Sequence, residues 1–147
     1  MENQFSIQLT EKAISALKES AKWSYFLAIL GFIGIFLMII AGIFMGSVMS
    51  MMPDQPGMGV LSAVKGFMSI IYIVMALLYF FPIYYFYKYA SGTKEALNTD
   101  NSEQLAEALV NLKSHHKFLG IMAIVIISMY VLMFFVGIVG GIFAAVS

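Results

Sequence analysis

The sequence predicts an all-α membrane protein with three transmembrane helices, in which amphipathic cytoplasmic helices precede spans 1 and 3. Residues 23–52, 66–87 and 118–147 contain no Asp, Glu, Lys, Arg or His. Across the whole chain, 61% of the residues are hydrophobic and only 11% are charged. A bilayer core of roughly 30 Å needs about 20 apolar residues in a helix. Lipid offers no water to satisfy open backbone groups, so each uncharged stretch must be helical.

Residues 1–147 form a single membrane domain in which charged and uncharged segments alternate. An amphipathic helix is expected over residues 8–22, followed by the first span over residues 23–50 and an outer loop over residues 51–62. The second span covers residues 63–89, and a polar cytoplasmic connection covers residues 90–101. A second amphipathic helix over residues 102–117 leads into the third span over residues 118–145. The first and third spans exceed the bilayer core, so they must tilt or extend past the outer surface.

Both amphipathic segments show an apolar and a polar face at helical spacing. Thr10 is the expected N-cap of the first, while Asp100 and Glu103 have capping-box spacing before the second. The apolar faces comprise Leu9, Ala13, Ile14, Ala16, Leu17 and Ala21, and then Leu105, Ala108, Leu109 and Leu112. These helices could lie flat on the inner leaflet, pack on each other or continue straight into their spans. Their polar faces carry both signs of charge, which favours helix packing or partner contact over adsorption to lipid.

Lysine positions predict the orientation, since cytoplasmic segments collect basic residues. Seven lysines lie before the first span or between the second and third: Lys12, Lys18, Lys22, Lys88, Lys94, Lys113 and Lys117. Only Lys65 lies on the other side. The amino terminus is therefore expected in the cytoplasm and the carboxyl terminus outside.

Aromatic residues mark the expected membrane–water interface. The anchors are Trp23 at the start of the first span and Tyr84, Tyr85, Tyr87 and Lys88 at the end of the second. Pro82 lies inside this aromatic belt and should kink the second span, because it removes a backbone donor. A simple interface kink is favoured over a gating hinge.

A weak internal repeat links the first and third spans. Leu17-Lys18 aligns with Leu112-Lys113, which lie 95 residues later, and Gly42-Ile43 aligns with Gly137-Ile138 at the same offset. Chance similarity between apolar helices is the alternative to a true repeat.

Each of these two spans carries a GxxxG motif, formed by Gly42 and Gly46 in the first and by Gly137 and Gly141 in the third. Small residues at this spacing let two helix backbones approach closely in lipid. The motifs predict close packing of the first span on the third, or of one protomer on another. The alternative is the ordinary glycine content of membrane helices.

Methionines gather around the outer loop, at Met45, Met49, Met51, Met52 and Met58. Thioethers are soft ligands suited to Cu(I), so these residues are candidates for a soft-metal site. Methionine is also a flexible filler of apolar gaps, and packing is the favoured interpretation. His115 and His116 adjoin the third span. His116 falls on the meridian of Leu105 and Leu112, and a half-buried or headgroup-contacting histidine pair is favoured over a pH sensor.

The composition argues against several classes of function. The chain has no Cys and a net charge of zero, so no thiolate site and no nucleic-acid binding are expected. Residues 23–52, 66–87 and 118–147 contain no Asp, Glu, Lys, Arg or His, whereas coupled transporters and intramembrane enzymes place such groups at membrane depth. We therefore expect no enzyme activity, no catalytic residue, no resident metal and no cofactor.

Several short motifs resemble an uncharacterised bacterial family of small multi-span integral membrane proteins that is known only as a domain of unknown function. They occur at residues 17–23, 26–33 and 79–82, at Leu112-Lys113 and Gly120-Ile121, and at Tyr130. The resemblance implies a bacterial cytoplasmic (inner) membrane location and brings no activity, substrate or cofactor with it.

The leading hypothesis is a non-enzymatic integral membrane subunit, a scaffold or accessory protein that acts through helix–helix association. Its partners would be the lipid bilayer and either further copies of the chain or another membrane protein. The alternative hypothesis is an oligomeric pore, or a copper-handling membrane protein that uses the Met-rich outer loop.

Overall fold

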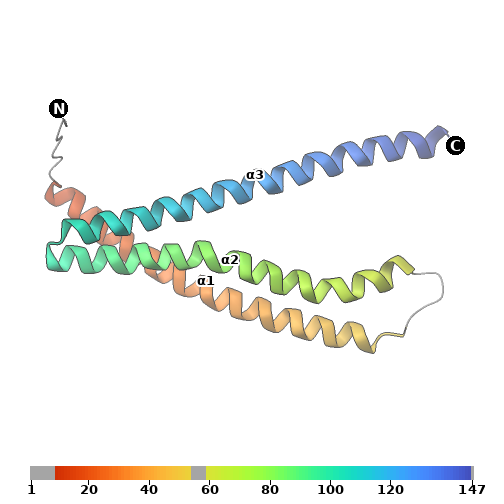
Figure 1. Ribbon diagram of the computed structural model, residues 1–147, viewed down its shortest axis with the longest axis horizontal. Helices are drawn as coiled ribbons and strands as arrows, with labels where there is room; N and C mark the ends of the chain where they lie inside the picture. The colour runs from red at the N-terminus through yellow and green to blue at the C-terminus, as the bar shows by residue number, and fades with distance from the viewer. Residues whose placement is uncertain (1–8, 54–58, 147) are drawn as a thin grey trace.

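The computed structural model describes the backbone of residues 9–53 and 59–146, and the side chains of residues 9–53 and 67–142. It contains three long helices, α1 (Glu11–Met51), α2 (Gly59–Thr99) and α3 (Ser102–Val146), and no strand within the described residues (Figure 1). The all-helical prediction is confirmed. Helices Glu11–Met51, Phe67–Thr99 and Ser102–Ile142 are each long and apolar enough to cross a membrane.

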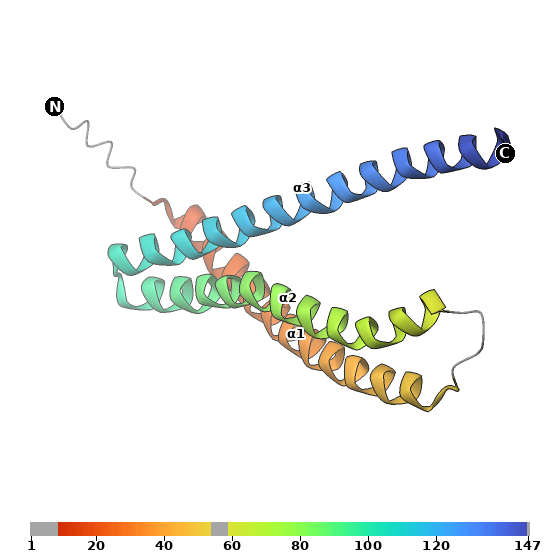
Figure 2. The same cartoon turned by 45° about the vertical axis from the view of Figure 1, so that its right-hand side comes forward.

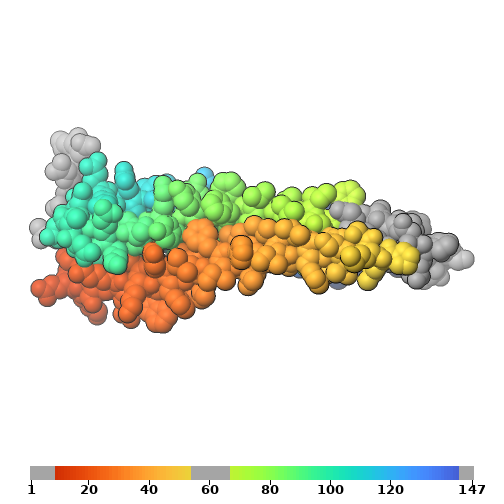
Figure 3. All heavy atoms as spheres, turned by 90° about the horizontal axis from the view of Figure 1, so that it is seen from below, coloured from red at the N-terminus to blue at the C-terminus, as the bar shows by residue number. Residues whose placement is uncertain are grey.

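Helix α2 is the central element of the fold. It runs antiparallel to α1, and the two stay side by side along their length (Figure 3). Helix α3 starts against the end of α2 and then diverges from it toward the carboxyl terminus (Figures 1 and 2). No Cα atom of α1 lies within 8 Å of one of α3 among the described residues. Because α1 and α2 are antiparallel, the amino-terminal end of α1 lies at the same end of the molecule as the α2–α3 turn (Figure 1).

The amphipathic segment 8–22 is not a separate helix. It starts at Glu11, where the Thr10 hydroxyl accepts a hydrogen bond from the Ala13 N–H at 3.3 Å, and continues into the first span. No Pro or Gly interrupts the chain before Gly31, so nothing ends the helix at the membrane boundary. Segment 102–117 likewise continues into α3. Of the three arrangements considered for these segments, the chain adopts the straight continuation.

The boundaries of α2 correct two predicted loops. The outer loop predicted over residues 51–62 is shorter, because α1 includes Met51 and α2 starts at Gly59. The connection predicted over residues 90–101 is helical as far as Thr99. Ser91 turns its hydroxyl back onto the Tyr87 carbonyl at 3.0 Å, so it does not break the helix. Gly92 serves close packing, since a Cβ there would lie 3.2 Å from the Ala108 Cβ of α3.

Only Asp100 and Asn101 connect α2 to α3. Asp100 has a φ of 49°, and the Asn101 N–H donates to the Ala96 carbonyl at 3.0 Å, which closes a Schellman-type end. The Asn101 side-chain oxygen then accepts from the Gln104 N–H at 3.1 Å and caps α3. The expected cap at Asp100 is thus wrong by one residue, because Asp100 is used to end the preceding helix.

A regularly spaced seam of apolar and small residues joins α1 to α2. Ile14, Ala21, Ala28, Ile35 and Gly42 follow one another at intervals of seven residues, and the last four are buried. A Cβ on Gly42 would lie 2.9 Å from the Tyr72 Cβ. This spacing is that of a coiled-coil seam, and its small side chains allow close approach of the two backbones.

The buried core lies mainly at the charged end of the molecule. We define this three-helix end as residues 11–24 of α1, 88–99 of α2 and 102–117 of α3. It holds most of the buried side chains, namely Ala21, Ser24, Tyr89, Ala90, Thr93, Ala96, Leu105 and Ala108. Beyond it, large apolar side chains are exposed on all three helices, and residues 123–142 of α3 are exposed throughout. Apolar side chains need no protein cover in lipid, so this burial pattern fits a multi-pass membrane protein.

Candidate functional site

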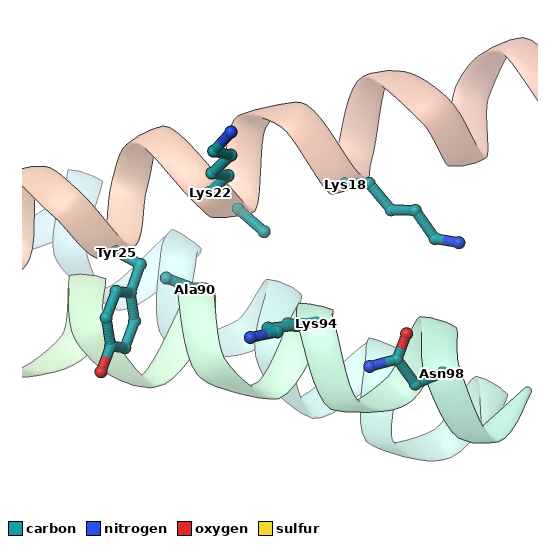
Figure 4. Close-up of a pocket in the computed structure, with 7 residues that line it drawn as sticks. Lys18, Lys22, Tyr25, Ala90, Lys94 and Asn98 are labelled. Atoms are coloured by element: carbon teal, nitrogen blue, oxygen red, sulfur yellow. The ribbon is translucent and has the colours of Figure 1, made fainter.

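A pocket of about 400 Å³ lies between α1 and α2 at the three-helix end (Figure 4). It is lined by Lys18, Ala21, Lys22, Tyr25, Ala90, Lys94 and Asn98. Three of these seven residues are lysines, and none is acidic. No carboxylate among the described residues lies within 4.0 Å of their ammonium groups. The lining is therefore positively charged, and none of its lysines forms an ion pair within the described residues.

Helical spacing places these side chains on facing stripes. Lys18, Lys22 and Tyr25 recur at steps of one turn on α1, as Ala90, Lys94 and Asn98 do on α2. The small side chains of Ala21 and Ala90 form the floor, where they are 2% and 1% exposed. Lys18 and Asn98 reach into the gap and Lys94 lies along α2, while the Lys22 ammonium turns toward the far side of α1 (Figure 4).

Aromatic rings continue from the pocket along the α1–α2 pair. The Tyr25 and Tyr87 ring centroids are 5.4 Å apart, and Phe32 lies 6.0 Å from both Tyr87 and Phe80. We call these four rings the aromatic ladder. The aromatic ladder begins at the pocket with Tyr25 and extends from there into the uncharged part of both helices.

His115 joins α3 to α2. Its Nδ1 lies 2.7 Å from the Pro82 carbonyl oxygen, and its ring stacks on Phe86 with a centroid distance of 4.5 Å. His116 is exposed, and its Nδ1 contacts the Leu112 carbonyl of its own helix at 2.9 Å. The expectation that His116 shares the apolar meridian is wrong. His115 follows Leu105, Ala108 and Leu112 on the face toward α2, whereas Leu109 is 43% exposed.

The structure separates the two GxxxG motifs. Gly42 and Gly46 face α2, where Ser69 donates a hydrogen bond to the Gly42 carbonyl at 2.9 Å and lies beside Gly46. Gly137 and Gly141 have no neighbouring atom within 4 Å of an added Cβ. Packing of the first span on the third is therefore absent among the described residues of the chain, and packing between protomers stays a prediction.

The other predicted residues lie apart from the pocket. Met45 and Met49 are half-buried on α1, whereas Met51 and Met52 are exposed at its end. Met58 lies outside the described residues. The anchor residue Trp23 is 59% exposed, and Lys88 lies over the Tyr84 ring at 5.2 Å from its centroid. Tyr85 and Tyr87 are half-buried nearby on α2.

No group of three or more His, Asp or Glu side chains in the described part of the chain is placed to hold a metal ion. The pocket is the feature that sequence reasoning missed. The one-turn spacing of Lys18, Lys22 and Tyr25 indicates the α1 half of the lining. Residues 90–98 fall in the predicted polar connection, for which no helical face is expected.

Comparison with known protein families gives a match. A family of unknown function, DUF5362, matches residues 48–138, which include the end of α1, all of α2 and most of α3. No curated protein and no solved structure matches the chain. The match covers more than half of the chain, and the protein therefore belongs to the DUF5362 family of unknown function.

Proposed function

We propose that this protein is a non-enzymatic integral membrane subunit that acts through helix–helix association, in the cytoplasmic membrane of a bacterium. The amino terminus and the three-helix end face the cytoplasm, and the carboxyl terminus faces outward. Seven of the eight lysines belong to segments that meet at the three-helix end, which supports this orientation. The resemblance of the sequence to small bacterial membrane proteins supports the location.

The observation that carries the proposal is the exposure of α3. Residues 123–142 are exposed throughout, and nothing lies within 4 Å of a Cβ added to Gly137, Gly140 or Gly141. In α1, by contrast, the equivalent small residues Gly42 and Gly46 are covered by α2. Glycines on a helix surface let a second helix backbone approach closely. The two helices then make van der Waals contacts that are more extensive than those between the glycine surface and lipid tails.

A second copy of the chain is the partner that we propose for this surface. The Gly137/Gly141 motif is complementary to itself under two-fold symmetry, so two α3 helices would meet through the same residues. The divergence of α3 from the α1–α2 pair leaves space for this contact on every side of its outer half (Figures 1 and 2). The protein would then serve as a scaffold, with the two three-helix ends held on one side of the membrane.

The test is the mass of the complex in mild detergent, measured by light scattering with correction for bound detergent. The wild-type protein is expected as a dimer, and Gly137→Leu/Gly141→Leu as a monomer, because two leucines would keep the backbones apart. Gly120→Leu is the matched control, since Gly120 is also free of neighbours on α3 and lies outside the motif. A monomeric wild-type protein, together with affinity purification from membranes that returns only background proteins, would refute the proposal.

A further inference from the structure

The lysine-lined pocket between α1 and α2 has the chemistry of an anion site. Its lining brings Lys18, Lys22 and Lys94 around one cavity of about 400 Å³ without a carboxylate. These lysines make the lining positive, and an anion bound in the cavity would be attracted to their charges. The Asn98 amide, which reaches into the gap, adds a neutral donor to the same lining (Figure 4).

A phosphate group fits this set of donors better than a carboxylate. Lysine is a compact point charge with three donors, and a phosphate offers several oxygen acceptors that can face lysines from two helices at once. Lys18 comes from α1 and Lys94 from α2, so lysines line the pocket from both helices (Figure 4). The Lys22 ammonium turns away from the pocket (Figure 4), but it is carried on a flexible stem that can swing inward.

The pocket also lies at a defined depth along the helices. Lys22 is the last charged residue of α1 before its uncharged stretch, and Lys88 is the first charged residue of α2 after its own. The lining residues Tyr25 and Ala90 therefore lie within a turn of the boundary where lysines and aromatic rings meet phospholipid headgroups. Basic pockets between helices at the cytoplasmic boundary are suited to lipid headgroups.

The aromatic ladder supplies a surface for the rest of such a ligand. From Tyr25 the ring contacts pass to Tyr87, Phe32 and Phe80, away from the charged end. Phe80 is 42% exposed, so a neighbouring acyl chain could lie against it. A free phosphate ion would use the lysines and leave the ladder without a role.

We propose that this pocket binds the phosphate of an anionic phospholipid, with Lys18 and Lys94 on the phosphate and the acyl chains along the aromatic ladder. The inference relies on the proposed insertion into a membrane, and it is independent of association through α3. It assigns a specific lipid site to the α1–α2 pair, beyond the general contact of the helices with the bilayer.

The experiment is native mass spectrometry of the full chain in mild detergent, titrated with phosphatidylglycerol or phosphatidylcholine of identical acyl chains. We expect the wild type to bind one phosphatidylglycerol in preference to phosphatidylcholine. Lys18→Gln/Lys94→Gln should weaken phosphatidylglycerol binding about tenfold or more, since each lysine near the headgroups contributes to anion affinity. Lys12→Gln/Lys113→Gln is the matched control, because it removes the same charge from the three-helix end outside the pocket, and it should change binding less than about twofold.

Three results would overturn the inference. Equal loss of binding in the two double variants would mean that the general surface charge attracts the lipid. Equal affinity for the two phospholipids would show that the pocket does not select an anionic headgroup. Displacement of phosphatidylglycerol by millimolar inorganic phosphate, with equal binding of glycerol phosphate that lacks acyl chains, would assign the pocket to a soluble anion instead. Carbonate extraction of membranes tests membrane insertion separately from lipid binding. The Gly137→Leu/Gly141→Leu variant should keep the preference for phosphatidylglycerol, since the lipid site does not depend on association through α3.

Discussion

Two adjacent polar residues, Asp100 and Asn101, reverse the chain direction between helices of 41 and 45 residues. Asp100 has a left-handed backbone, a conformation that costs other side chains more than Gly, Asn or Asp. Asn101 caps α3 through the Gln104 N–H. The sequence predicted a turn and a cap here but chose the wrong residue for the cap. Both residue types cap helices, and only the three-dimensional end of α2 decides which of them is free to do so.

The two turn residues are expected to respond to substitution in opposite directions. Asp100→Gly should raise the free energy of unfolding by about 0.5 to 1 kcal/mol, because glycine adopts a positive φ without a steric penalty. Asn101→Ala should lower it by about 1 kcal/mol, because the first turn of α3 loses its cap. Thermal unfolding followed by circular dichroism in one detergent measures both, and exposed Ser102→Ala is the control with no change. Destabilisation by Asp100→Gly would contradict the role given to its backbone.

At the scale of elements, α2 holds the molecule together because it alone contacts both other helices within the described residues. Its seam with α1 was open to prediction, since the series Ala21, Ala28, Ile35 and Gly42 recurs at seven-residue spacing in the sequence. Its contact with α3 was not. Gly92 suggested a loop by its residue type, and only the proximity of Ala108 shows that it serves packing. The GxxxG motifs suggested a partner by their spacing, but spacing does not say which helix that partner is.

The contact between α3 and the Pro82 turn of α2 gives a prediction at this scale. His115→Phe should keep the stacking on Phe86 and lose the contact with the Pro82 carbonyl. A lost hydrogen bond of about 1 kcal/mol corresponds to roughly fivefold faster opening. Hydrogen–deuterium exchange of residues 102–117 should speed up by that factor in His115→Phe. It should stay unchanged in His116→Phe, whose histidine bonds only within its own helix. Equal effects of the two variants would show that His115 does not fasten α3.

At the scale of the whole molecule, polar and apolar surfaces are divided along the length of the helices. The three-helix end has a packed core, and the uncharged parts of the three helices beyond it expose leucine, isoleucine and phenylalanine to their surroundings. This division was predictable, because the absence of charge in residues 23–52, 66–87 and 118–147 fixes where water is excluded. The divergence of α3 was not predictable, because lipid-facing positions and free partner-facing positions have the same composition.

The proposed orientation has a direct test, because the chain contains no Cys and single cysteines can be introduced as unique reporters. Met52→Cys lies at the outer end of α1, and Lys12→Cys lies near its start. In intact cells, a membrane-impermeant maleimide should label Met52→Cys and should reach Lys12→Cys only after permeabilisation. Asn98→Cys, near the α2–α3 turn, should behave as Lys12→Cys does. Labelling of positions 12 and 52 from the same side would rule out a membrane crossing by α1.

The two-residue turn at Asp100 and Asn101 also makes α3 a lever. With 45 residues at 1.5 Å each, this helix is about 67 Å long. A tilt of about 5° at the turn would therefore carry its far end by about 6 Å. Small rearrangements near His115, or of side chains around a ligand beside α2, would therefore produce a larger change in the distance between the far end of α3 and the α1–α2 pair.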